Sequence, residues 1–170
     1  MRNTIVAALL SGLVGFSAYA EECTPKEQEY FLALTIYHEA RGEDLDSQQL
    51  VGEVVLNRIE SVSYPDTVCE VVLQKNKNGV PQFSFINKSD LKPKEKEAWE
   101  TAEILAEDLL SGEIEYFDNG ATHFINPNGV SKMPGWTKKF KMVGKHGKHI
   151  FYADGSEKEN MYFYSSHNPM

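Results

Sequence analysis

The sequence of 170 residues lacks several features that mark common functional classes. It holds 17 basic against 25 acidic residues, so it has no cationic surplus with which to neutralise the phosphates of a nucleic acid. It has no internal repeats and no long linkers. With 41% hydrophobic and 25% charged residues, its composition is that of one ordinary globular domain.

Long hydrophobic runs are also missing, apart from a short one near the start. A charged beginning, the apolar segment 5–16 and the ending Ala18-Tyr19-Ala20 form the pattern of a secretory signal peptide. The segment is too short, and too rich in small residues, for a stable membrane span, although a retained weak anchor is the alternative. We therefore expect residues 1–20 to be a signal peptide and residues 21–170 to be one domain in the periplasm or outside the cell.

Removal of this signal would take away one basic residue and no acidic one, which leaves a net charge of −9. Cysteine is scarce, with only Cys23 and Cys69 present. An even count in an oxidising compartment predicts one disulfide between them. Two buried free thiols are the alternative.

Helical patterns dominate the first two thirds of the sequence. Apolar residues recur at three- and four-residue steps in a helix that begins at Pro25 and stops at Gly42, and in one that opens at 46–49 and runs to Ile59. A short helix is expected from 64–66 onward, and a long one over about 93–111, before Gly112. The first has the strongest start, because Thr24 and Glu27 form a capping box.

The last third of the sequence has a β-like pattern and many turn residues instead of helical periodicity. Short β-like pieces are expected at 114–117, 120–125, 139–143 and 149–152, separated by Asn, Gly and Pro turns. The alternating segment 82–85 is typical of a short strand or an extended loop. The sequence therefore predicts one α+β domain.

Glu39 stands out because it lies in the last turn of the first predicted helix, near its apolar face. A carboxylate in such a place is costly unless it is paired or neutralised. A carboxyl group that an apolar setting keeps protonated can donate a proton to the leaving oxygen of a glycosidic bond. The alternative is a structural carboxylate paired with Arg41 or Arg58.

Other chemistries find less support. His38-Glu39 invites a zinc-peptidase interpretation, but that motif requires a second histidine at position 42, where Gly42 stands. His146 and His149 flank a glycine in what looks like a turn, so they are interpreted as supporting donors or surface histidines. There is no G-x-S-x-G motif of a serine hydrolase. We expect no metal ion and no cofactor.

Seven motifs in a fixed order carry a resemblance to a known family. They are 36–43 (IYHEARGE), 51–58 (VGEVVLNR), 64–72 (YPDTVCEVV), 82–85 (QFSF), 120–124 (GATHF), 134–136 (PGW) and 146–152 (HGKHIFY). Over about residues 34–152 the sequence resembles the catalytic domain of the cell wall hydrolases related to the spore-cortex-lytic enzymes. The resemblance implies a lysozyme-like helical lobe and a small β- and loop-rich lobe around a glycan groove.

The resemblance also implies an activity. It indicates a lytic transglycosylase that cleaves the bond between N-acetylmuramic acid and N-acetylglucosamine in peptidoglycan, with Glu39 as the single acid and base. The 6-hydroxyl of the muramic acid would attack and give a 1,6-anhydro product. A hydrolytic muramidase or glucosaminidase and a non-catalytic glycan-binding protein are the alternatives. The expected partner is the glycan strand, bound by a monomer.

The remaining motifs predict a groove lining. We expect substrate contacts from polar and aromatic side chains at Gln82, Ser84, Thr122, His123, Trp136 and Tyr152. Supporting roles are expected for four further residues. Glu43 is expected to be a structural or substrate-contacting acid, and Glu53 either bonds to the backbone of a neighbouring loop or lies at the rim of the groove. Asn57 is expected to brace the loop after its helix, and His149 to act as a supporting donor.

Overall fold

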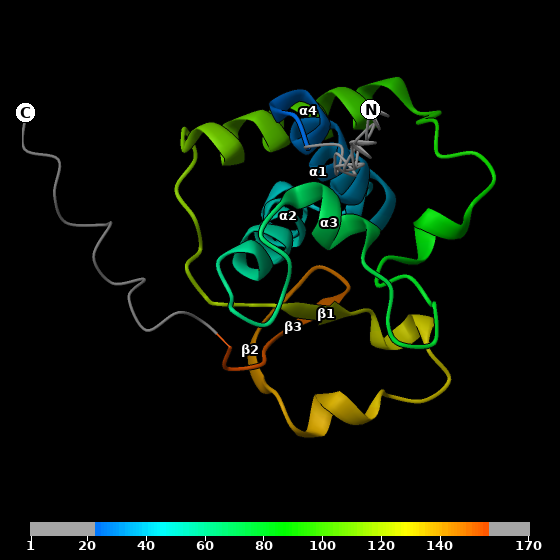
Figure 1. Ribbon diagram of the computed structural model, residues 1–170, viewed down its shortest axis with the longest axis vertical. Coiled ribbons are helices and arrows are strands. Elements are labelled where there is room, and N and C mark those ends of the chain that lie inside the picture. Colours follow the sequence, from blue (N-terminus) through cyan, green and yellow to red (C-terminus); the bar gives the residue numbers. More distant parts are fainter. Residues whose placement is uncertain (1–22, 157–170) are drawn as a thin grey trace, which may run out of the picture.

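The computed structural model describes residues 23–156; the predicted signal peptide at 1–20 lies outside them. In chain order the elements are α1 (Pro25–Ala40), α2 (Leu45–Ile59), α3 (Val68–Leu73), η1 (Ser84–Asn87), α4 (Lys96–Ser111), β1 (His123–Ile125), η2 (Pro127–Gly129), η3 (Gly135–Lys138), β2 (Lys141–His146) and β3 (His149–Ala153). Figure 1 shows the α-helices gathered in one lobe, and the sheet with its loops in a second. The predicted α+β class is confirmed.

Helix α1 begins as the sequence predicts. Thr24 accepts a hydrogen bond from the Glu27 N–H, and the Glu27 carboxylate accepts one from the Thr24 N–H, so the capping box is complete. At the other end, Gly42 has a φ of +86°, a left-handed conformation that favours glycine. This turn ends α1 beside Glu39 and leads to Asp44, whose side chain caps α2.

Helix α2 is the centre of the helical lobe, and all its residues from Ser47 to Arg58 are buried. It contacts α1, α3 and α4. A Cβ atom at Gly52 would lie 2.7 Å from Cδ1 of Leu109 and 3.1 Å from Cδ1 of Ile36. The missing side chain of Gly52 therefore lets α1 and α4 pack closely against α2, which holds the catalytic candidate on α1 in a rigid lobe.

The disulfide between Cys23 and Cys69 is present, as the sequence predicts. It joins the residue before α1 to α3, across 46 residues of sequence. Because α3 also packs against α1 and α2, the bond closes the helical lobe at the start of the described chain.

The sheet of the second lobe has the strand order β1-β3-β2, and all neighbours are antiparallel. Phe151 of β3 is fully buried, and with Ala121 it packs against Leu50 and Val54 of α2. Figure 1 shows the sheet directly beside the helical lobe. This contact fixes the distance between the two lobes.

One predicted strand, 114–117, is wrong, and the segment 82–85, predicted as a short strand or an extended loop, is not a strand. The segment 82–85 leads into the 3₁₀ helix η1, in which Ile86 and Lys88 donate backbone hydrogen bonds to Phe83 and Phe85. The segment 114–117 has no strand partner among the described residues; instead, its Phe117 N–H donates to the carboxylate of Glu53. The backbone is satisfied within a 3₁₀ turn in the first case and by a distant side chain in the second, so a sheet is not needed.

Two helices also begin later than expected. Helix α3 begins at Val68, because Thr67 is its N-cap. Helix α4 begins at Lys96, because the backbone N–H groups of Lys94 and Glu95 donate to the hydroxyl group of Tyr37. Both differences come from capping partners that the hydrophobic pattern does not reveal.

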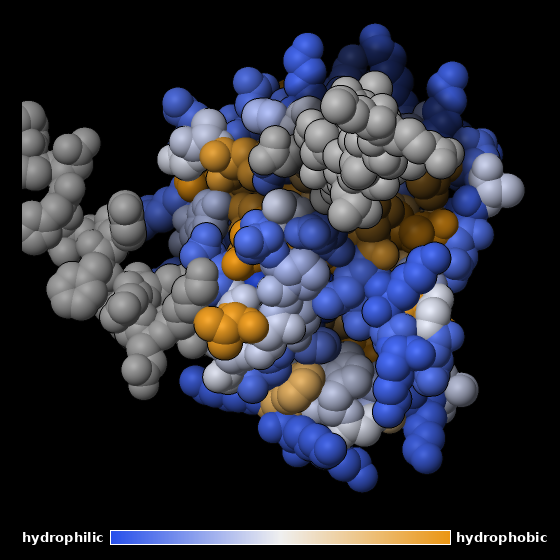
Figure 2. Space-filling view, in the orientation of Figure 1, coloured by the Kyte–Doolittle hydropathy of each residue, from blue (hydrophilic) through white to orange (hydrophobic). Residues whose placement is uncertain are grey.

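On the face shown in Figure 2, hydrophilic residues predominate and apolar residues form several separate areas. Within residues 23–156, no helix has the length and hydrophobicity needed to cross a membrane.

Candidate active site

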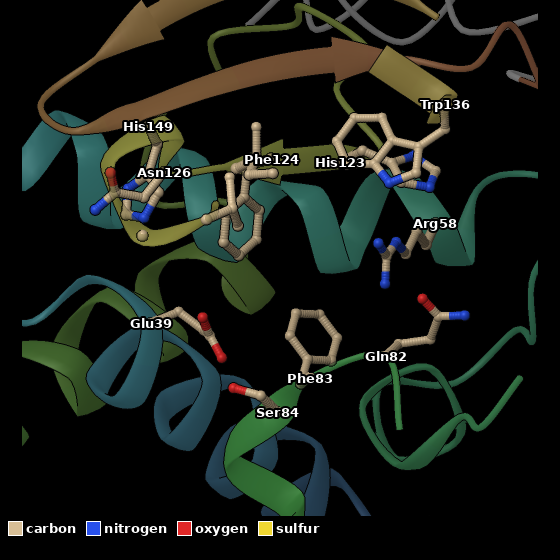
Figure 3. Close-up of a pocket in the computed structure, with 13 residues that line it drawn as sticks. Glu39, Arg58, Gln82, Phe83, Ser84, His123, Phe124, Asn126, Trp136 and His149 are labelled. Atoms are coloured by element: carbon tan, nitrogen blue, oxygen red, sulfur yellow. The ribbon is translucent and has the colours of Figure 1, made fainter. Parts of the chain in front are cut away.

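A pocket of about 460 Å³ lies between the two lobes. Figure 3 shows Glu39 at one end of it, Arg58 and Trp136 at the other, and the rings of Phe83 and Phe124 between them. Its lining consists of Glu39, Arg58, Gln82, Phe83, Ser84, His123, Phe124, Ile125, Asn126, Gly129, Val130, Trp136 and His149. The pocket thus collects residues from α1, α2, the η1 region, the sheet and the loops that follow β1.

Glu39 is half-buried, and its carboxyl group points into the pocket (Figure 3). The alternative of a structural ion pair is not found. Arg41 pairs with Glu95 at 2.8 Å, and Arg58 donates to the carbonyl of Thr122. Among residues 23–156 no hydrogen bond or ion pair ties the Glu39 carboxylate, so it is available to a ligand.

Burial raises the pKa of Glu39 above the ordinary glutamate value of 4.5, and the positive charge of Lys88 offsets part of this increase. Desolvation disfavours the ionised form, so the carboxyl group keeps its proton to a higher pH than an exposed glutamate does. An unpaired carboxyl group with such a pKa is suited to donate a proton inside the pocket.

The two neighbouring glutamates have structural partners instead. Glu43 accepts hydrogen bonds from the backbone N–H and the ammonium group of Lys148, and these bonds lower the pKa of Glu43. Glu53 is buried on α2 and accepts from Phe117 N–H and from the Gln49 side chain. Neither lines the pocket, so Glu39 is the one carboxylate in its described lining.

His123 lines the pocket, whereas its neighbour Thr122 is fully buried behind it. The Thr122 hydroxyl accepts a hydrogen bond from Asp154 N–H at 3.2 Å and lies at hydrogen-bond distance, 3.0 Å, from Nδ1 of His123. Burial, together with the nearby charge of Arg58, lowers the pKa of His123 to about 4. His123 is thus a neutral ring near pH 7.

The structure separates the predicted substrate contacts into two groups. Gln82, Ser84, His123 and Trp136 lie in the lining, as does His149 among the supporting residues. Thr122 and Tyr152 lie behind it: Thr122 has no exposed surface, and Tyr152 packs its ring against Trp136 in an edge-to-face contact. These two are therefore placed to position pocket residues, and not to touch a ligand in this arrangement.

Two supporting residues hold the site in shape. Asn57 donates to the carbonyl of Ala121 at 2.9 Å, so it braces the loop that carries His123 and not the loop after its own helix, which the sequence analysis expected. His149 is almost fully buried against the ring of Phe124, and its burial lowers its pKa.

Several lining residues were missed by the sequence analysis. They are Arg58, Phe83, Phe124, Ile125, Asn126, Gly129 and Val130. Asn126 and Gly129 flank a proline turn, a weak signal of a loop and not of a site. Arg58 lies in the motif 51–58, but its place in the pocket depends on α2 meeting β1, which the motif does not reveal.

A metal site has little support from the geometry. In the described part of the chain, no three His, Cys, Asp or Glu side chains come together as potential ligands.

Comparisons with known proteins agree with the fold. The sequence model of the Cell Wall Hydrolase family matches residues 42–152, which begin just after Glu39. Spore cortex-lytic enzymes of Halalkalibacterium halodurans and Oceanobacillus iheyensis are 32% identical over 124 residues and 30% identical over 118 residues. These alignments cover 71% and 68% of this chain but only 33% and 38% of the relatives, so the chain spans about a third of their length.

Solved structures agree as well. The catalytic domain of the germination-specific lytic transglycosylase SleB from Bacillus anthracis is 28% identical with a TM-score of 0.59, over 74% of this chain and 93% of that one. The catalytic domain of the Bacillus cereus SleB protein is 27% identical with the same TM-score, over 75% and 90%. The domain is thus lysozyme-like, with a helical lobe and a small β lobe. Since the family model matches most of the described residues, the chain belongs to the cell wall hydrolase family of enzymes.

Proposed function

We propose that this protein is an exported lytic transglycosylase that cleaves the bond between N-acetylmuramic acid and N-acetylglucosamine in peptidoglycan. The observation that carries the proposal is that, among residues 23–156, Glu39 is the one carboxyl group that lines the pocket between the two lobes, and it is unpaired. The family membership and the lytic transglycosylase named among the structural neighbours support it.

In the proposed reaction, the protonated Glu39 donates its proton to the glycosidic oxygen as the bond to the anomeric carbon breaks. The resulting carboxylate then accepts the proton of the muramoyl 6-hydroxyl group, whose oxygen bonds to the same carbon. The products are a 1,6-anhydro sugar and a new free 4-hydroxyl group. Glu39 regains its proton and no water is consumed.

The number of carboxylates favours this route over hydrolysis. Most glycosidases that use water need a second carboxylate as nucleophile or base. Glu39 stands alone in the described lining, since Glu43 is bound to Lys148 and Glu53 to Phe117. An internal nucleophile removes the need for the second group. A hydrolytic muramidase or glucosaminidase is the alternative, and it would have to position its water without such a base.

The charge distribution also suits an anionic polymer, although the whole chain is acidic. Residues 126–156 contain six lysines and one aspartate. Lys132, Lys138, Lys139, Lys141 and Lys145 are exposed, and none of them forms an ion pair within the described residues. The second lobe can therefore attract the carboxylates of a cell wall while the helical lobe carries the excess acid.

Export and location are part of the proposal. The signal-like residues 1–20 support export, and the disulfide between Cys23 and Cys69 fits an oxidising compartment. The periplasm or the cell exterior is therefore the expected place of action.

Digestion of purified peptidoglycan tests the reaction type. We expect fragments that end in 1,6-anhydro-N-acetylmuramic acid, each lighter by one water than the hydrolytic product, and mass spectrometry measures this difference. Fragments with reducing ends would contradict transglycosylation and support a hydrolase. The absence of any fragments, with wall binding retained, would support a glycan-binding protein instead.

The pH dependence of cleavage tests the role of Glu39 by a second route. The proposed cycle starts with protonated Glu39, so kcat/KM should fall as pH rises through the raised pKa of Glu39. Lys88 lowers that pKa by its positive charge. In Lys88→Met the pKa of Glu39 should increase, and the alkaline limb of the profile should move to higher pH. Lys92→Met, which removes a lysine not coupled to Glu39, is the control and should leave the limb in place. A shift to lower pH in Lys88→Met would exclude Glu39 as the acid.

A further inference from the structure

Arg58 is a buried cation without an anionic partner. Only 5% of its surface is exposed, yet it lines the pocket. Its Nε donates to the carbonyl of Thr122 at 2.8 Å, and its guanidinium group lies 5.3 Å from the ring centre of Tyr64 and 5.2 Å from that of Phe83. Its Nη1 has no hydrogen-bond partner, and no carboxylate lies within ion-pair distance in residues 23–156.

This arrangement is energetically unfavourable for the isolated protein. Burial opposes the charged form of Arg58 and lowers its pKa, but an arginine side chain still keeps its charge in a protein. Asp154 is the carboxylate that affects the pKa of Arg58, and its oxygens are bonded to Tyr64 and Ser156. A buried charge without a partner costs free energy unless a ligand completes the pair. The bond to Thr122 alone does not require a cation.

The surroundings of Arg58 are those of a sugar-binding subsite. Figure 3 shows its guanidinium group between Gln82 on one side and His123 with Trp136 on the other, at the end of the pocket away from Glu39. Gln82 offers an amide group, and the neutral ring of His123 offers a nitrogen that can form a hydrogen bond. The indole of Trp136 is a flat apolar face of the kind that contacts sugar rings. These neighbours suit a sugar, so we expect an anion that binds Arg58 to be carried on one.

We propose that Arg58 binds a carboxylate carried on the lactyl substituent of a muramoyl residue, and so selects muramoyl over N-acetylglucosaminyl sugars at this end of the pocket. This inference rests on the proposed function, because it assumes a peptidoglycan ligand. The carboxylate has two possible sources: the lactyl group itself, where the stem peptide has been removed, or an acidic residue of the stem. A guanidinium group presents two parallel donors to either one.

Binding measurements in the Glu39→Gln background separate recognition from cleavage. Four tetrasaccharide probes are compared by calorimetry. Three consist of alternating N-acetylglucosamine and N-acetylmuramic acid: two carboxylate probes, with free lactyl groups or with Ala-Glu stems, and one neutral probe, whose lactyl groups are methylamides. The fourth is chitotetraose, which has no lactyl group. We expect at least one carboxylate probe to bind about 10-fold more tightly than the methylamide, the gain expected of a charge-assisted hydrogen bond. Whichever of the two binds more tightly identifies the source of the carboxylate.

Arg58→Met, added to Glu39→Gln, keeps an extended side chain and removes the charge. We expect the preference for carboxylate over methylamide to fall within about 2-fold, while the affinity for chitotetraose changes by less than about 2-fold. Arg58→Lys retains a point charge and should keep part of the preference. If the protein with Arg58 intact binds the methylamide and both carboxylate probes equally, the inference is overturned. This outcome does not depend on whether Arg58→Met folds. Cleavage of peptidoglycan is measured separately, so failure of the proposed function is distinguishable from failure of this subsite.

Discussion

Replacement of Glu39 by glutamine should reduce the kcat for cleavage of peptidoglycan by about 100- to 10,000-fold. Glutamine has nearly the same shape, but its amide group has no acidic proton that it can transfer to the glycosidic oxygen. Because no second carboxylate lines the described pocket, no neighbouring group can take over the role. The measurement is the release of soluble muropeptides from purified peptidoglycan over time.

The matched control is Glu29→Gln, the same change on the same helix. Glu29 lies outside the pocket between the lobes, so this variant should retain the wild-type rate. If Glu39→Gln keeps more than about a tenth of the activity, Glu39 is not the general acid, since removal of such a group costs at least 100-fold.

Folding of the Glu39→Gln variant can be checked by a change of stability with a defined sign. Burial raises the pKa of Glu39 in the folded protein, so the stability from this group is present below pH 4.5, its ordinary value, and is lost as pH rises through the raised pKa. Glutamine does not ionise. At neutral pH the variant should therefore melt higher than the wild type, by roughly 2–4 °C for each kcal/mol in a domain of this size, and the difference should vanish at low pH.

Loss of the disulfide should produce the largest change in stability. Cys23→Ser opens a loop with a sequence separation of 46, and loop-closure entropy predicts a loss of about 4 kcal/mol. This corresponds to a melting temperature lower by roughly 8–16 °C. Cys23 is the better site for the change, because Cys69 is the more deeply buried of the two and its replacement would also disturb packing. Thermal unfolding followed by circular dichroism measures the effect.

Reduction of the wild-type protein provides the control for this variant. A thiol reductant should lower the melting temperature of the wild type by a similar amount and leave Cys23→Ser unchanged. A melting temperature of Cys23→Ser equal to that of the oxidised wild type would contradict a stabilising role of the bond. The variant should keep its activity at temperatures well below its melting temperature, because the disulfide and Glu39 lie at opposite ends of α1.

The parts of the fold that depend on local signals were predictable. The capping box at Thr24 and the glycine at position 42 define α1, because caps and left-handed turns involve residues close together in sequence. The same holds for Gly112, which ends α4 in the left-handed conformation. The cysteine count and the signal-like start also predicted the disulfide, which the structure contains.

Strands were less predictable where distant groups satisfied the backbone. The alternation of residues 82–85 is typical of a strand, but Phe83 and Phe85 are both buried within a 3₁₀ turn. The segment 114–117 is bound by Glu53, which is about 60 residues earlier in the chain. Alternation of apolar and polar residues predicts which side chains are buried, but it does not predict which group forms hydrogen bonds with the backbone.

By itself, the sequence predicted the helices from local spacing, the cysteine pair from its count and the signal-like start, and Glu39 as the candidate acid from its helical position and the ordered motifs. The tertiary structure alone decided which carboxylates are free: it bound Glu43 to Lys148 and Glu53 to Phe117 and left Glu39 unpaired among residues 23–156. It also placed Arg58 in the pocket without a counter-ion in the described part of the chain. The physical reason is that the protonation and partners of a buried group depend on what packs around it, and here those neighbours come from helices and strands far apart in the chain.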